Sequence, residues 1–111
     1  MEETIEPPAA ETLRVPGMES GTKTLATAGP TRGSSVIADI RADKGSMWVM
    51  FDCRGAGTAE IALEPLVSMP FTCLDSTITP TMNQIDLKSK TRLRVRVQAP
   101  ESVEWTLRVT Q

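Results

Sequence analysis

The sequence predicts an all-β fold, an antiparallel β-sandwich of the jelly-roll or immunoglobulin-like kind with about seven or eight strands. Three observations predict this fold class. Short apolar segments alternate with polar residues at a period of two, turn residues separate these segments, and no window has a helical period. The chain has 111 residues, of which 40% are hydrophobic, so it can form one core.

The first 21 residues have the composition of a linker. Residues 1–20 carry five acids and one base, and Pro7, Pro8 and Pro16 interrupt regular structure. We therefore expect residues 1–21 to form a flexible, acidic and proline-rich linker that folding does not need. A short edge strand over residues 11–15 is the alternative. Residues 22–111 then form the β-sandwich domain.

The first half of this domain contains four segments with strand patterns. They cover residues 23–28, 36–41, 47–53 and 59–64. Residues 47–53 are largely apolar on both faces, which predicts a central strand covered on each side for part of its length. Gly55 and Gly57 follow this strand, and they permit a tight turn at little cost in backbone strain.

The middle of the domain has a weaker pattern. Prolines bracket residues 66–69, which suits an edge strand or a bend. Residues 74–84 leave two interpretations open. Ile78 and Met82 face inward on a strand that Pro80 interrupts, or they cover the open end of the sandwich.

The C-terminal residues have the clearest pattern. Apolar and polar residues alternate over 92–97 and again over 103–109, with turn residues at 99–102. This pattern predicts a β-hairpin with one apolar face. Matching the apolar faces of its two strands places Arg96 opposite Glu104, as a cross-strand ion pair.

Cys53 and Cys73 are the two cysteines of the chain, and each ends a strand-forming segment. They form one disulfide if the protein is exported and remain two buried thiols if it is cytosolic. Their even number and their positions favour a disulfide that joins neighbouring strands. Closing the loop from residue 53 to residue 73 stabilises the fold by roughly 3 kcal/mol.

Composition argues against several functions. Histidine and tyrosine are absent, which removes the commonest general base and the usual zinc ligand sets. No apolar run approaches the ~20 residues of a transmembrane helix. The net charge is −4 for residues 1–20 and +2 for the remainder, and neither value indicates nucleic acid as a partner. We therefore expect no enzyme activity, no cofactor, no metal, no nucleic acid and no transmembrane segment.

Three segments together resemble small secreted and lipid-anchored β-sandwich domains of actinobacteria: DCRGAGTAEI, MPFTC and LRVRVQAPESVEWTLRVTQ. A C-x-G-x-G turn, a second cysteine and a terminal V-x-W-x-L-x-V strand recur in those domains. The residues that carry the resemblance are Cys53, Gly55, Gly57, Cys73 and Trp105. The resemblance covers residues 22–111 and implies export and a disulfide. It implies little about activity, because most of those domains have no assigned function.

The start of the chain, MEETIEPPAA, lacks the basic region and the apolar core of a signal peptide. A secreted or extracytoplasmic protein of the cell envelope would need an export signal that this sequence does not include. The alternative is a protein that stays inside the cell.

Five cations occupy every second position of one segment: Lys88, Lys90, Arg92, Arg94 and Arg96. On an extended chain they would all project from one face. This row predicts a platform for an anionic partner, such as a phosphate-bearing wall polymer, a lipid headgroup or an acidic protein. The alternative is a solvated sheet face whose charges discourage edge-to-edge aggregation.

These observations lead to two functional hypotheses. The first is a non-catalytic extracytoplasmic binding domain whose partner is a protein or an anionic component of the cell envelope. The second is a structural subunit of a phage or surface assembly that packs against copies of itself through its sheet edges. The sequence leaves the oligomeric state open.

Overall fold

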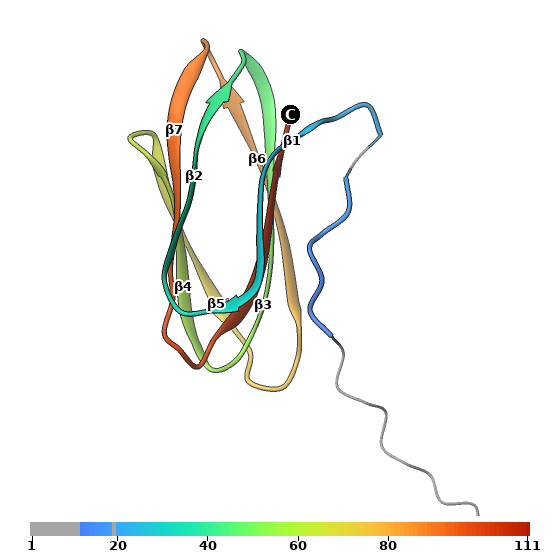
Figure 1. Cartoon of the computed structure of the whole chain (residues 1–111), viewed down its shortest axis with the longest axis vertical. Coiled ribbons are helices and arrows are strands. Elements are labelled where there is room, and N and C mark those ends of the chain that lie inside the picture. Colours follow the sequence, from blue (N-terminus) through green and yellow to red (C-terminus); the bar gives the residue numbers. More distant parts are fainter. Residues whose placement is uncertain (1–11, 19) are drawn as a thin grey trace, which may run out of the picture.

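Eight strands form two four-stranded antiparallel sheets that face each other (Figure 1). The computed structural model describes residues 12–18 and 20–111. The strands are β1 (Thr24–Arg32), β2 (Ser35–Ala42), β3 (Gly45–Arg54), β4 (Gly57–Glu64), β5 (Val67–Cys73), β6 (Thr79–Leu87), β7 (Thr91–Gln98) and β8 (Glu104–Thr110). Within these described ranges, no helix is long and apolar enough to cross a membrane. The predicted all-β sandwich is confirmed.

The strand pairing is nested. Sheet A has the order β1-β8-β3-β6, and sheet B has the order β2-β7-β4-β5. The pairs β1·β8, β2·β7, β3·β6 and β4·β5 are those of one long hairpin closed at the β4–β5 turn. When this long hairpin folds around the core, the pairs β1·β8 and β3·β6 lie in sheet A, and the pairs β2·β7 and β4·β5 lie in sheet B. This is the jelly-roll topology, so the structure decides between the two kinds of sandwich that the sequence predicted.

The core lies between the sheets. The fully buried inward-facing side chains include Met47, Val49 and Phe51 of β3, Ile61 and Leu63 of β4, and Trp105, Leu107 and Val109 of β8. The Trp105 ring stacks on Phe51 at a centroid distance of 5.9 Å. Its Nε1 donates a hydrogen bond of 2.8 Å to the carbonyl of Gly33, which satisfies the only polar atom of the indole.

The predicted C-terminal hairpin is wrong. β7 belongs to sheet B and β8 to sheet A, so residues 99–103 cross from one sheet to the other. Arg96 pairs with Glu64 at 2.9 Å, and Glu104 pairs with Arg54 at 2.9 Å. Alternating apolar residues fit two strands of one hairpin, but they fit equally well two strands that face the same core from opposite sheets.

The middle of the chain forms the outer strands β5 and β6. β5 is an edge strand, as one interpretation of residues 66–69 expected. Met82 opposes Met50 on the outer face of sheet A and is 58% exposed, so the prediction that it faces inward is wrong. Thr81 takes the inward position opposite Phe51, and its Oγ1 donates a hydrogen bond to the Phe51 carbonyl. Periodicity left this strand as one of two interpretations, because its inward positions near the sheet edge are polar.

Gly55 lies where two loops meet at one end of the sandwich. Its φ is +120°, and a Cβ there would lie 2.0 Å from the carbonyl oxygen of Ser102. Its N–H donates a hydrogen bond of 2.8 Å to the Leu74 carbonyl. Only glycine fits both this backbone conformation and this close approach.

Cys53 and Cys73 form a disulfide with a Cα–Cα distance of 5.7 Å, which confirms the predicted pairing. The bond does not join neighbouring strands. Cys53 ends the apolar part of β3 in sheet A, and Cys73 ends β5 in sheet B. Both residues are buried. The disulfide therefore links the two sheets at one end of the core.

Residues 12–18, here called the N-terminal arm, lie along the outer face of sheet A (Figure 1). Leu13 is only 2% exposed. The arm receives hydrogen bonds from side chains of β8, which is a different contact from the edge strand considered for residues 11–15. Residues 1–11 and 19 lie outside the described residues. The flexibility and dispensability of residues 1–21 stay predictions.

The disulfide should contribute substantially to stability. Replacing both cysteines with alanine should lower the free energy of unfolding by about 3 kcal/mol, because the unfolded chain regains the freedom of the closed loop. Guanidinium unfolding followed by tryptophan fluorescence measures this difference. Reductant should destabilise the wild type by the same amount and leave the double variant unchanged. A wild type that is indifferent to full reduction would contradict the prediction.

Candidate functional site

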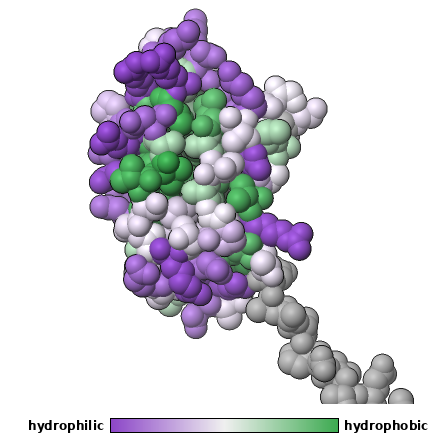
Figure 2. All heavy atoms as spheres, in the orientation of Figure 1, coloured by the Kyte–Doolittle hydropathy of each residue, from purple (hydrophilic) through white to green (hydrophobic). Residues whose placement is uncertain are grey.

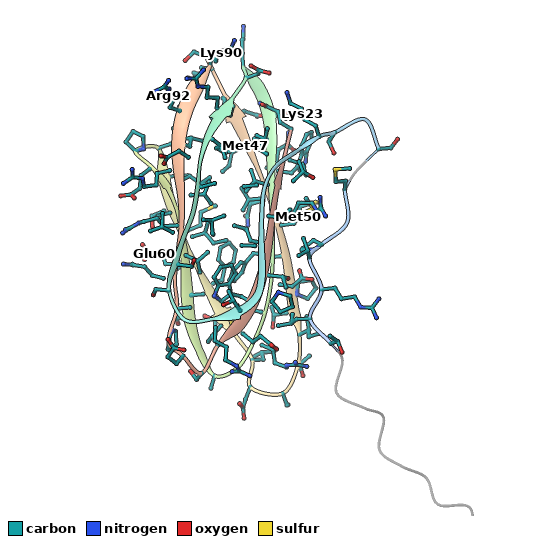
Figure 3. All side chains as sticks on the ribbon, viewed as in Figure 1. Lys23, Met47, Met50, Glu60, Lys90 and Arg92 are labelled. Carbon is teal, nitrogen blue, oxygen red and sulfur yellow. A yellow bond between two sulfur atoms is a disulfide. The ribbon has the colours of Figure 1, made fainter. Side chains whose placement is uncertain are left out.

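The outer face of sheet B carries the arginines of the predicted cationic row. Arg92, Arg94 and Arg96 alternate along β7 with buried apolar residues, so they project away from the core. Lys88 and Lys90 lie in the turn between β6 and β7. The five cations therefore do not lie on one extended strand, because the chain changes sheets within the row. Figure 3 shows Lys90 and Arg92 at the same end of the sandwich.

Three of the five cations have carboxylate partners. The ion pairs are Lys90 Nζ with Asp43 Oδ1 at 3.8 Å, Arg94 Nε with Asp39 Oδ1 at 3.1 Å, and Arg96 Nε with Glu64 Oε1 at 2.9 Å. The side-chain hydrogen bond from Arg94 to Asp39, together with their attraction, raises the pKa of Arg94. The Arg96 pair lacks the alignment of a hydrogen bond. These pairs reduce the positive charge that the row offers to a partner.

Arg92 differs from its neighbours on β7. It lies directly opposite Arg41 of β2, and both side chains are exposed. Within the described part of the chain, no carboxylate forms an ion pair with either arginine. Two like charges at opposed positions of an antiparallel pair destabilise it. An anion bound between the two guanidinium groups would remove this repulsion.

The two arginines border a surface groove. A hollow of about 590 Å³ is lined by residues that include Arg41, Arg92, Glu64 and Pro65. An adjoining hollow of about 260 Å³ is lined by Arg41, Lys90, Thr91 and Arg92. The two hollows share Arg41 and Arg92, and we call them together the arginine groove. Guanidinium groups bind phosphate or carboxylate oxygens through paired N–H donors, so this geometry suits an anionic group.

Sequence reasoning missed Arg41. Arg41 ends the predicted strand over residues 36–41, but nothing in the local pattern shows which strand lies beside it. The register of β2 on β7 places it opposite Arg92. Arg41 and Arg92 are 51 positions apart in the sequence, and alternation within each strand carries no information on such a pairing.

The outer face of sheet A carries a half-buried acid. Asp52 of β3 lies between Pro80 of β6 and Thr106 of β8. Burial raises the pKa of its carboxyl above the ordinary value of 3.8. In the described ranges, no group of three or more histidine, cysteine, aspartate or glutamate residues could hold a metal ion. We assign Asp52 no chemical role.

No protein family model, curated protein or solved structure matches this chain. The functional argument therefore rests on the geometry of the arginine groove.

Asp52 should make stability depend on pH. Its raised pKa means that the folded state binds the proton more tightly than the unfolded state, so wild-type stability falls as pH rises through the folded pKa. The Asp52→Asn variant should therefore be more stable than wild type at pH 7. This advantage should shrink on acidification and disappear below pH 3.8, where Asp52 is protonated in both states.

Urea unfolding of both proteins at neutral and acid pH measures the difference. Asp75→Asn serves as the control, since Asp75 is an exposed acid in the β5–β6 loop and should show no such gain. A constant difference between Asp52→Asn and wild type at every pH would contradict the burial argument.

Proposed function

We propose that this protein is a non-catalytic binding domain that takes a phosphate-bearing component of the cell envelope in the arginine groove. A wall polymer and a lipid headgroup share this chemistry. The opposed pair of Arg41 and Arg92 is the observation that carries the proposal. The rest of the cationic row contributes to the local potential, but three of its members already have carboxylate partners.

The energetics favour binding at this pair over binding along the whole row. An anion that approached Arg94 would compete with Asp39, which already bonds its Nε. An anion between Arg41 and Arg92 displaces no described carboxylate, and it offsets the repulsion between two like charges at opposed positions. Both side chains are exposed, so salt should weaken the interaction.

The disulfide supports an extracytoplasmic location. Disulfides persist in oxidising compartments and are rare in the cytosol of most organisms. The bond between Cys53 and Cys73 is consistent with an extracellular protein. An envelope location would place the arginine groove among polymers and headgroups that carry phosphate.

A structural subunit is the second candidate function. Figure 2 shows hydrophobic side chains at the surface along β2 and between β2 and β1, where edge strands of the two sheets meet. The partly buried residues that these strands contribute are Leu25, Ala28, Ile37 and Ala38. Such a seam favours packing against other copies through the sheet edges. A ring or shell of defined mass in native solution would support this function over the binding domain.

Removing the opposed pair should weaken binding to anionic surfaces. The Arg41→Ser/Arg92→Ser variant should bind vesicles of phosphatidylglycerol and phosphatidylcholine about thirtyfold more weakly than wild type at low salt. This estimate assigns about 1 kcal/mol to each arginine at an anionic lipid surface. Cosedimentation with vesicles measures it, and isolated cell walls provide a second probe that separates a wall polymer from a headgroup.

The matched control is Arg14→Ser/Arg32→Ser, which removes the same charge away from the groove. It should bind nearly as wild type does. If both double variants lost the same affinity for the vesicles, net charge and not the opposed arginine pair would account for binding. A wild type that binds neither vesicles nor cell walls at low salt would overturn the proposed function.

A further inference from the structure

The side chains of β8 hold the N-terminal arm through its backbone. Thr106 Oγ1 donates a hydrogen bond of 2.9 Å to the Arg14 carbonyl. Arg108 Nε donates to the Pro16 carbonyl. The two donors are two residues apart on β8, and the two acceptors are two residues apart on the arm. The arm therefore runs parallel to β8 as an extended segment, with matching spacing.

A buried leucine precedes the two bonded residues of the arm. Leu13 is 2% exposed although it lies outside the core between the sheets. On the outer face of sheet A, Met50 is 7% exposed and Thr106 is fully buried. Figure 3 shows Met50 on the side of the sheet that faces the arm. This face thus combines a place for one leucine with donors for carbonyls at every second residue, the properties of a site for an extended peptide.

The contact surface continues beyond the two bonded carbonyls. Thr110 is the next outward-facing residue of β8 after Thr106 and Arg108, and its Oγ1 is buried without a hydrogen-bond partner among the described residues. Beside it, Thr24 Oγ1 bonds Met18 Sδ at 2.9 Å. The arm therefore leaves the buried hydroxyl of Thr110 without a hydrogen bond among the described residues.

The turn at Ser20 and Gly21 is exposed and leads from the arm to β1. Gly21 has a φ of +84°, a conformation that only glycine adopts without strain. Nothing lies within 4 Å of the position that a Cβ on Gly21 would occupy. The turn is thus held by its backbone conformation and not by packing at this residue.

We propose that the outer face of β8 binds the N-terminal arm of a second copy, so that two chains exchange arms to form a dimer. The exchanged arm has the same sequence and makes the same contacts, so the closed and exchanged forms differ mainly in the turn at Gly21. This inference does not depend on the arginine groove, which lies on the other sheet.

Substitution at Gly21 tests the exchange. Valine at this position disfavours the positive φ of the closed turn, and its Cβ would have open space around it, so Gly21→Val should favour the exchanged dimer. We expect its dimer dissociation constant to be at least tenfold lower than that of wild type. Size-exclusion chromatography with light scattering, from micromolar to millimolar protein, measures this constant in the full chain.

Two further variants assign the dimer to the arm. Gly17→Val is the matched control, because Gly17 also has open space around it but no positive φ, and it should dimerise as wild type does. Leu13→Asp added to Gly21→Val should restore the monomer, and Leu13→Ala should do so in part if the aspartate variant folds poorly. An unchanged dissociation constant in Gly21→Val, or a dimer that persists when Leu13 is replaced, would overturn the proposal.

Discussion

The apolar layer between the two sheets is the interaction on which the rest of the structure depends. Each sheet presents a face of buried apolar side chains to the other, and neither of these faces is stable until the other covers it. The rings of Phe51, Trp105 and Phe71 lie in this layer, and the Cys53–Cys73 bond links the sheets at one end. In this topology every connection except the β4–β5 turn joins strands of different sheets, so the chain contributes alternately to the two inner faces.

The same constraint determines the two outer faces. Since alternate side chains point inward, the remaining positions of each strand are displayed on the outside, and a slip of one residue would exchange the two sets. Sheet B displays arginines and acids, and sheet A displays the hydroxyl and guanidinium groups of β8. The two surfaces are thus suited to different partners: an anionic group on sheet B and an extended segment of polypeptide on sheet A.

The cationic row illustrates how register changes the meaning of a sequence pattern. In the sequence its five members look equivalent. In the structure, β2 brings Asp39 to Arg94, β4 brings Glu64 to Arg96, and β2 also brings Arg41 to Arg92. One strand therefore carries two neutralised arginines and one that faces another positive charge. The candidate site is therefore at Arg92 and Arg41, and it depends on which strands lie beside β7.

The sequence by itself determined most of the strands and their inward-facing residues, because a period of two and a preference for strand-forming residues are local properties. It also favoured the pairing of the two cysteines. Only the tertiary structure decided that the last two strands lie in different sheets, that Met82 faces outward, that Arg41 opposes Arg92 and that Leu13 is buried. An alternating strand shows which of its faces is apolar. It does not show which strand lies beside it, because that choice depends on how all eight strands together cover one core.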